Sequence, residues 1–290
     1  GLLDGDWINN GTISADRAGQ DLQITGPVDQ TGGGVIRADN AGRLLLRNAQ
    51  VLGGTLDSSP DASVEIIFDN SSLDAVTNLG AFGLLSGANA EILAGGLTNN
   101  GAITINSSAG VGSTSLLAAA PVTIDGTGTI ALGVSETNAD FTDATLGNLD
   151  AQSLTLGAGQ TVTGKGRLIG DIRVEGTIAP GNNPGGGAVE TIRIRQSGTS
   201  QAFALAASSE YSVDADAEES NDTLDSTVPV TLEGGTLRFT PVDGFDPPRP
   251  TRYTIIEAPS ITGTFGTLIY EGTLPEGAVF RVVYEDQEVI

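Results

Sequence analysis

The sequence predicts an all-β protein, a right-handed parallel β-helix (a solenoid) that ends in a C-terminal β cap. Three observations lead to this prediction. Short stretches of alternating apolar and polar residues follow glycine turns throughout the chain. These steps recur a little over twenty residues apart, which is typical of a solenoid. Helical periodicity is nearly absent, because Gly, Thr or Asn interrupts every candidate apolar stripe.

The composition fits thin aliphatic layers separated by many turns. The 290 residues include 41 glycines, and hydrophobic residues make up 39% of the chain while aromatic residues make up only 4%. Gly, Asn, Asp and Ser favour tight turns, whereas Val and Ile favour strands. We therefore expect a narrow interior of Val, Ile, Leu and Ala side chains, with each coil stacked on the next.

The predicted elements are short strands, each introduced by a glycine turn and each presenting alternate side chains to two faces. Eight examples in chain order are residues 10–13, 33–36, 53–56, 100–105, 126–130, 175–178, 234–237 and 271–274. The step from Ile13 to Val35 spans 22 residues, as does the step from Leu156 to Ile178. The step from Ile103 to Ile130 spans 27, as expected where a loop is inserted into a coil.

Two segments interrupt the regular pattern. Ser113–Pro121 is rich in alanine and is either a short helix or a buried strand. Ala202–Asp225 contains an acidic run that begins at Asp214. Several carboxylates and an Asn lie close together in this run, which is one feature of calcium sites. The run lacks the spacing of a calcium-binding loop, however. We expect a solvated acidic loop instead.

Charge and residue usage exclude several classes of protein. With 13 basic and 36 acidic residues the net charge is −23, which repels phosphate backbones, so we expect no nucleic-acid partner. Cys, His and Met are absent, which removes disulfides, thiolate nucleophiles and the commonest metal ligands. No apolar run is long enough to span a membrane, and we expect no direct membrane insertion of this segment. The chain begins at Gly1 within the repeat pattern, so we expect a mature or trimmed form.

The second half of the chain carries an ordered series of motifs. It opens with GQTVTGKGRLIGDIRVEGTIAPGNNPGG at Gly159–Gly186, in which Asn183 stands where a Ser is usual. The later motifs are Tyr211–Val213, Asn221–Leu224, Gly234–Leu237, Tyr253–Ile256 and Gly263–Phe265. In this order the motifs resemble the C-terminal part of bacterial autotransporter passenger domains and related β-helical surface adhesins. The resemblance implies a right-handed β-helix whose last coils form a stabilising cap, at the bacterial cell surface or outside the cell.

This resemblance divides the chain into two parts. Residues 1–156 match only in the style of their repeats and are expected to form repetitive β-helix coils. Residues 157–290 are expected to form the last coils and the cap. A serine-protease triad, which some passengers carry, is impossible here because the chain has no histidine.

Some parallel β-helices cleave polysaccharides with clustered carboxylates and basic residues, so catalysis is one hypothesis for this chain. The candidate groups are Asp39 with Arg37 and Arg43, and Asp171 with Arg173 and Glu175. Alternate residues of a strand share a face, so each group also fits an exposed face with cross-strand ion pairs. No lyase motif accompanies them, and we expect no enzymatic activity, cofactor or metal.

The remaining motifs have structural explanations that are simpler than functional ones. Gly32–Gly34, Gly185–Gly187 and Gly164–Gly166 lack the strand, spacing and helix of a phosphate-binding loop. Trp7 is either an exposed platform for sugar stacking or a packed residue near the chain start, and packing is favoured.

Two functions from different classes remain open. The first is a non-catalytic, secreted or cell-surface structural or adhesive rod, which self-associates through exposed coil ends into filaments. It would present loops to a host, a surface or a polysaccharide ligand. The second is a carbohydrate-active β-helix that binds or cleaves polysaccharides. Both need the same rigid scaffold, so the sequence favours the first only through the lack of a catalytic motif.

Overall fold

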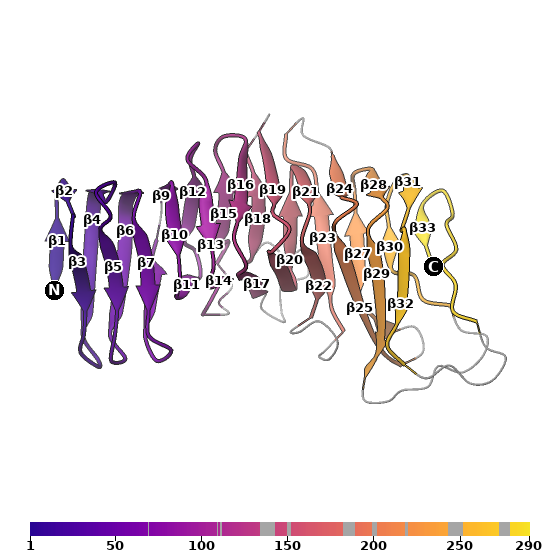
Figure 1. The fold of residues 1–290 in the computed structure, drawn as a ribbon, viewed down its shortest axis with the longest axis horizontal. Helices are drawn as coiled ribbons and strands as arrows, with labels where there is room; N and C mark the ends of the chain where they lie inside the picture. Colours follow the sequence, from indigo (N-terminus) through magenta and orange to yellow (C-terminus); the bar gives the residue numbers. More distant parts are fainter. Residues whose placement is uncertain are drawn as a thin grey trace.

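The computed structural model describes residues 1–68, 70–108, 110, 112–133, 143–149, 152–181, 189–198, 202–217, 220–242, 252–272 and 279–290. Within these residues the protein is all-β and contains no helix. The strands form one sheet of 22 strands and a second sheet of 11 strands. Figure 1 shows the strands side by side across an elongated molecule, with the N- and C-termini at opposite ends of its longest axis.

The larger sheet contains two ladders of paired strands, which share the long strands β4, β6 and β20. The first ladder runs through β1 (Leu2–Asp4), β4 (Asp21–Asp29), β6 (Arg43–Leu52), β8 (Ser63–Ile66), β11 (Ala81–Leu84), β14 (Ala102–Ile105), β17 (Thr129–Gly133), β20 (Thr161–Ile169), β22 (Thr177–Pro180), β25 (Glu210–Ala217), β29 (Thr236–Pro241) and β32 (Thr267–Tyr270). The second runs through β2 (Trp7–Ile8), β4, β6, β9 (Ser71–Asp74), β12 (Asn89–Ile92), β15 (Ser115–Ala118), β18 (Thr145–Asn148), β20, β23 (Thr191–Arg195), β27 (Thr223–Ser226), β30 (Ile256–Glu257) and β33 (Glu288–Val289).

The smaller sheet is the third ladder. It runs through β3 (Thr12–Ala15), β5 (Val35–Ala38), β7 (Thr55–Ser58), β10 (Val76–Asn78), β13 (Leu97–Asn99), β16 (Val122–Asp125), β19 (Ser153–Leu156), β21 (Asp171–Val174), β24 (Phe203–Leu205), β28 (Val230–Glu233) and β31 (Ile261–Thr264). The named strands pair in parallel, except that β33 runs antiparallel to β30 and the short β26 (Ser220–Asn221) runs antiparallel to β25. The predicted all-β class and the predicted parallel pairing are therefore confirmed.

The observed register confirms one of the predicted spacings and corrects two, and the first correction is that Ile13 pairs with Ile36 and not with Val35. Ile103 pairs with Ile130, so the longer step of 27 residues is a true ladder step. The equivalence of Leu156 and Ile178 is wrong, because Leu156 pairs with Val174 in the third ladder. Ile178 belongs to the first ladder, where it pairs with Val162.

The core is a continuous column of aliphatic side chains that point inward from all three ladders. Ile24, Ile36 and Leu46 are fully buried near the N-terminal end. Among the described residues Phe82 is the one aromatic core residue in the N-terminal half, and aromatic residues cluster toward the C-terminus, where Phe239 packs on Tyr253 and Tyr270 with ring centroids 5.4 and 6.0 Å apart. The expectation of a mainly aliphatic interior is met over most of the length.

Both irregular segments of the sequence lie in strands. Ser113–Pro121 contains β15, whose Leu116 and Ala118 are fully buried, so the buried-strand alternative holds and the helix is wrong. The acidic run beginning at Asp214 is not a solvated loop over its described residues. Asp214 lies in β25 and Asp222 directly precedes β27, and both side chains are buried.

Buried amides connect successive turns of the chain where the strands bend. Asn99 is fully buried; its Oδ1 accepts a hydrogen bond from Asn78 Nδ2 at 2.8 Å, and its Nδ2 donates to Gln160 Oε1 at 3.0 Å. Gln160 Nε2 in turn donates to the carbonyl of Asp125 at 2.9 Å. A second pair, Asn9 and Gln30, does the same near the N-terminus, at 3.0 Å. These side chains bond backbone groups that the bends leave without strand partners.

Candidate functional site

A polar cleft lies on the outer face of the second ladder, over β23, β27 and β30. Its volume is about 500 Å³, within the range of small-molecule sites. The described residues that line it are hydrophilic: Thr191, Arg193, Asn221, Thr223, Asp225, Arg252, Thr254 and Glu257. The strand alternation explains this lining, since the residues between them, such as Ile192 and Leu224, point into the core.

The cross-strand register brings the charged groups of the cleft together. Arg193 on β23 pairs with Asp225 on β27, and Asp225 pairs with Glu257 on β30. Strands that are more than thirty residues apart in sequence therefore place an arginine and two carboxylates in one row. Adjacent residues of such a row are about 4.8 Å apart.

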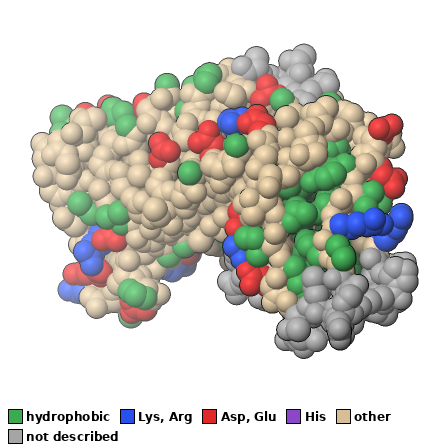
Figure 2. All heavy atoms as spheres, turned by 45° about the vertical axis from the view of Figure 1, so that its right-hand side comes forward, with side chains coloured by type: hydrophobic (Ala, Val, Ile, Leu, Met, Phe, Trp, Pro, Cys, Tyr) green, Lys and Arg blue, Asp and Glu red, His purple; other side chains and the backbone are tan. Residues whose placement is uncertain are grey.

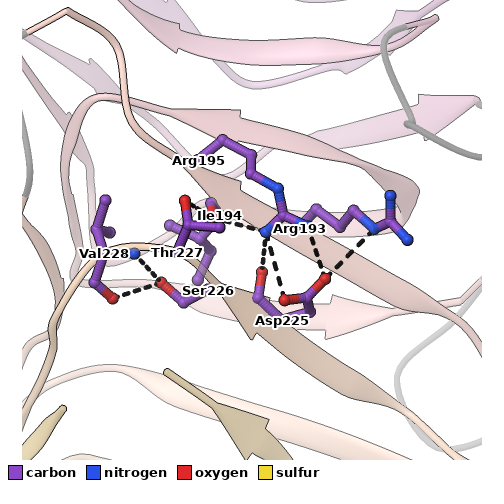
Figure 3. Close-up of polar contacts among 7 residues, drawn as sticks. All are labelled: Arg193, Ile194, Arg195, Asp225, Ser226, Thr227 and Val228. Atoms are coloured by element: carbon purple, nitrogen blue, oxygen red, sulfur yellow. Dashed lines mark hydrogen bonds and ion pairs between the residues drawn. The ribbon is translucent and has the colours of Figure 1, made fainter. Parts of the chain in front are cut away.

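Asp225 is held by two arginines (Figure 3). Arg195 donates from Nη2 to Asp225 Oδ2 at 2.7 Å and from Nη1 to the Asp225 carbonyl at 2.8 Å. Arg193 Nε lies 3.4 Å from the same carboxylate oxygen, and its terminal nitrogens point away from Asp225. The carboxylate thus orients both guanidinium groups, and this engagement makes Asp225 a poor candidate for an acid or a nucleophile.

Two further charges of the cleft have no such partner. Arg252 and Glu257 are both exposed, and neither forms an ion pair with another described residue. Thr254 and Asn221 complete the wall, and Asn221 Nδ2 donates to the Thr254 carbonyl at 3.0 Å. The cleft therefore offers an accessible cation, an accessible carboxylate and several hydroxyl groups to a ligand.

The first catalytic candidate from the sequence is a set of ion pairs. Arg37 Nε lies 2.6 Å from Asp39 and its Nη1 lies 3.3 Å from Asp57. Arg43 does not join them, because it binds Glu65 at 2.7 Å on another ladder. Bonding to Asp39 and the charge of Asp57 raise the pKa of Arg37, as expected of a paired guanidinium.

The second candidate is likewise an exposed face of paired charges. Arg173 binds Glu233 through both terminal nitrogens, at 2.7 and 2.8 Å, and contacts Glu175 at 3.2 Å. Asp171 accepts a hydrogen bond from the Ala202 N–H at 2.8 Å, away from this group. Hydrogen bonding to Glu233 raises the pKa of Arg173 and lowers that of Glu233. The alternative of cross-strand ion pairs therefore describes both candidates.

The glycine motifs also occupy structural positions. Gly164 sits inside β20 with a φ of +89°, and an added Cβ would lie 2.2 Å from the Leu132 carbonyl oxygen. Lys165 next to it lies 3.4 Å from Glu190. Gly32–Gly34 form the turn before β5, and Gly185–Gly187 lie outside the described residues. Neither described motif leads into a helix.

A buried carboxyl near the cleft was not anticipated. Asp222 accepts hydrogen bonds from the N–H of Glu190 at 2.8 Å and from the N–H of Asp214 at 3.0 Å. Burial raises the pKa of Asp222 to about 8, the two N–H groups oppose this rise, and the charges of Asp214 and Glu190 add to it. Among the described residues no three carboxylates are placed to hold a metal ion.

The two ends of the molecule form a second candidate interface. At the N-terminal end Trp7 points toward the core, in register with the buried Val28, yet 40% of its surface is exposed. Trp7 is therefore neither a fully exposed platform for sugar stacking nor a fully packed residue, since it packs on one side and is open on the other. At the C-terminal end Leu268, in register with the buried Leu237, is 43% exposed. Figure 2 shows hydrophobic side chains gathering on this part of the molecule.

Comparison with known proteins gives no assignment. No protein-family model matches the chain, and the search of curated proteins found no match. The resemblance to autotransporter passenger domains therefore stays a prediction. Within the described part of the chain, no helix is long and apolar enough to cross a membrane.

Proposed function

We propose that this chain is a right-handed parallel β-helix that acts as a non-catalytic structural or adhesive rod, secreted or at the bacterial cell surface, and assembles end to end. The regular succession of strands supports the helix. The chain passes through the first, second and third ladders in the same order, turn after turn, and each turn pairs in parallel with the next. A right-handed path is the rule for parallel strands joined in this way.

A C-terminal cap is part of this proposal. β33 adds to β30 in the antiparallel sense, with Val289 fully buried opposite Ile256. Phe280 packs on Phe239 and Tyr270, with ring centroids 5.6 and 5.4 Å apart. Residues 279–290 thus cover core that the last strands would otherwise expose.

The main support for end-to-end assembly comes from the pairing of the outermost strands at the two ends. β1, β2 and β3 each pair on one side only, with β4 or β5. At the other end, within the described residues, β31 and β32 each pair with a strand on one side only, and the Ile261 N–H at the start of β31 donates to the Asp286 carbonyl at 3.1 Å. Open edges accept further strands, from another coil of the same chain or from a neighbouring copy. A second copy placed head to tail would continue parallel pairing in the first ladder and along the rest of β31 in the third, while β33 closes the second ladder.

Trp7 provides a direct test, because it is the only tryptophan and lies at the N-terminal end. In the purified 290-residue chain, we expect its emission to shift to shorter wavelength as concentration rises. Light scattering should show mass increasing in parallel, and electron microscopy should show rods several molecules long. Monodisperse monomers with concentration-independent emission would refute the assembly.

Two end variants test the head-to-tail geometry. Ile13→Lys places a charge at the N-terminal core position and Leu268→Lys does so at the C-terminal one. Each variant alone should stop at monomers, and an equal mixture should form heterodimers, since each retains one intact end. Leu52→Lys, at a half-exposed leucine away from both ends, is the matched control. If Leu268→Lys alone still dimerises, the contact is a symmetric N-terminal one and the head-to-tail proposal is wrong.

A further inference from the structure

The polar cleft of the second ladder lies on the side of the rod near its C-terminal end, where β30 also pairs with β33 of the cap. We propose that this cleft binds an acidic saccharide, meaning a uronic-acid unit of a polysaccharide. The proposal rests on the chemistry of the cleft and does not depend on end-to-end assembly.

The first argument is charge. The chain carries −23 overall and only 13 basic residues, so cations are scarce on its surface. Arg193, Arg195 and Arg252 nevertheless come together around this one cleft. Arg167 precedes Arg193 in the cross-strand register and extends the row. Asp225 neutralises part of this charge, so the exposed Arg252 is the cation that can attract a ligand carboxylate locally.

The second argument is the geometry of the cations. Asp225 fixes the guanidinium of Arg195 through three hydrogen bonds that involve its carboxylate and its carbonyl. The same carboxylate lies 3.4 Å from Arg193 Nε. Arg252 is exposed and forms no ion pair with another described residue. An arginine in this state suits bidentate binding of a ligand carboxylate.

The third argument separates a sugar from other anions. Thr191 and Thr223 are adjacent in the cross-strand register, and Thr254 and Asn221 lie beside them. Their hydroxyl and amide groups both donate and accept hydrogen bonds. Glu257 can only accept hydrogen bonds, so it can bind the hydroxyl groups of a ligand. A ligand with one carboxylate and several hydroxyls per unit can use the arginine, the hydroxyl and amide groups and Glu257 together, whereas inorganic phosphate is mainly an acceptor and offers little to Glu257.

Saccharide binding can be measured by titration calorimetry with an oligogalacturonate. Its fully methyl-esterified form is the uncharged comparison. We expect the acid to bind and the ester to bind at least ten-fold more weakly, because the arginines lose their anionic partner. Raising NaCl from 50 to 200 mM should weaken the binding of the acid. Equal binding of acid and ester, or no binding of either at millimolar concentration, would overturn the proposal.

Variants locate the ligand in the cleft. Arg252→Ala should weaken binding of the acid about ten-fold, the size of one charge-assisted contact. Glu257→Gln removes a negative charge beside the ligand and keeps a hydrogen-bond acceptor, so it should bind the acid as tightly as the wild type or more tightly. Arg238→Ala, a control outside the cleft whose arginine is paired with Glu210, should have no effect. If Arg252→Ala binds like the wild type, the ligand sits elsewhere.

Two further measurements separate this proposal from its alternatives. Inorganic phosphate that bound as tightly as the uronate and competed with it would reduce the cleft to a general anion site and overturn the saccharide assignment. Trp7 emission should show that Arg252→Ala leaves end-to-end assembly unchanged. Loss of saccharide binding with intact assembly therefore concerns the cleft alone, and loss of assembly with intact binding concerns the rod ends alone.

Discussion

The carboxyl of Asp222 makes the stability of the C-terminal part of the molecule depend on pH. Its pKa is about 8 in the folded protein, against an ordinary value of 3.8. Between these values the folded state holds a proton that the unfolded state has released. The free energy of unfolding therefore falls as pH rises from about 4 to about 8, by on the order of 1 kcal/mol per pH unit. The contribution of Asp222 to the free energy of unfolding is fully present only below its ordinary pKa of 3.8.

Asp222→Asn tests this dependence because the amide cannot ionise. Urea unfolding at pH 5 and pH 8 should show a larger loss of stability in the wild type than in the variant. Asp16→Asn, which removes a charge from an exposed position, should keep the slope of the wild type. If Asp222→Asn and Asp16→Asn show the same slope, Asp222 is not the group that titrates.

The buried amides make a second residue-scale prediction. Asn99→Ala removes the acceptor of Asn78 Nδ2 and the donor to both Gln160 Oε1 and the Thr129 carbonyl. Buried polar atoms then lose their partners, and we expect unfolding to become easier by about 2–3 kcal/mol. Thr98→Ala, at the half-buried outward position next to it, should cost about 0.5 kcal/mol or less. Equal losses measured by urea unfolding would contradict a structural role for the amide stack.

At the scale of single elements, the local pattern identified strands well. The unit at residues 100–105 is β14, and the unit at residues 126–130 leads into β17, its neighbour in the first ladder. Glycine turns and alternating side chains are local properties, so a short window of sequence contains what determines them.

The ladder to which a strand belongs could not be predicted in the same way. Each turn of the chain contains up to three strands with nearly the same pattern, and the lengths of the connections vary. Leu156 and Ile178 therefore looked equivalent although they lie in different ladders. Register between turns is set by which aliphatic side chains stack in the core, and that is a property of several turns together.

The cleft escaped prediction for the same reason. Arg193, Asp225 and Glu257 lie on successive strands of the second ladder, each about one turn after the last. The only local hint is that polar residues alternate with Ile in Thr191–Arg195, which also describes any strand with one exposed face. Burial of Asp222 was equally hidden, because the acidic run around it favours exposure when judged by composition alone.

At the scale of the whole molecule, the long axis separates two kinds of contact. The ends present strand edges and apolar side chains, namely those of Trp7 and Leu268. The side of the rod presents the polar cleft. A filament of stacked copies would carry one cleft per molecule along its length, and a polymeric ligand would be held at many points at once.

The last prediction is that salt has opposite effects on end-to-end assembly and on binding of an acidic saccharide. Copies that each carry −23 repel one another, so end-to-end assembly should strengthen as NaCl rises from 50 to 500 mM and screens that repulsion. Apolar contacts at the ends are not weakened by this change. Binding of an acidic saccharide should weaken over the same range, because it depends on attraction to the arginines.

Sedimentation velocity for assembly and calorimetry for binding, in the same buffers, measure both trends. Magnesium chloride at matched ionic strength shows whether divalent cations add a bridging effect between rods. Assembly that weakens with NaCl would mean that the ends meet through ion pairs, and the account based on open strand edges and apolar end residues would then fail.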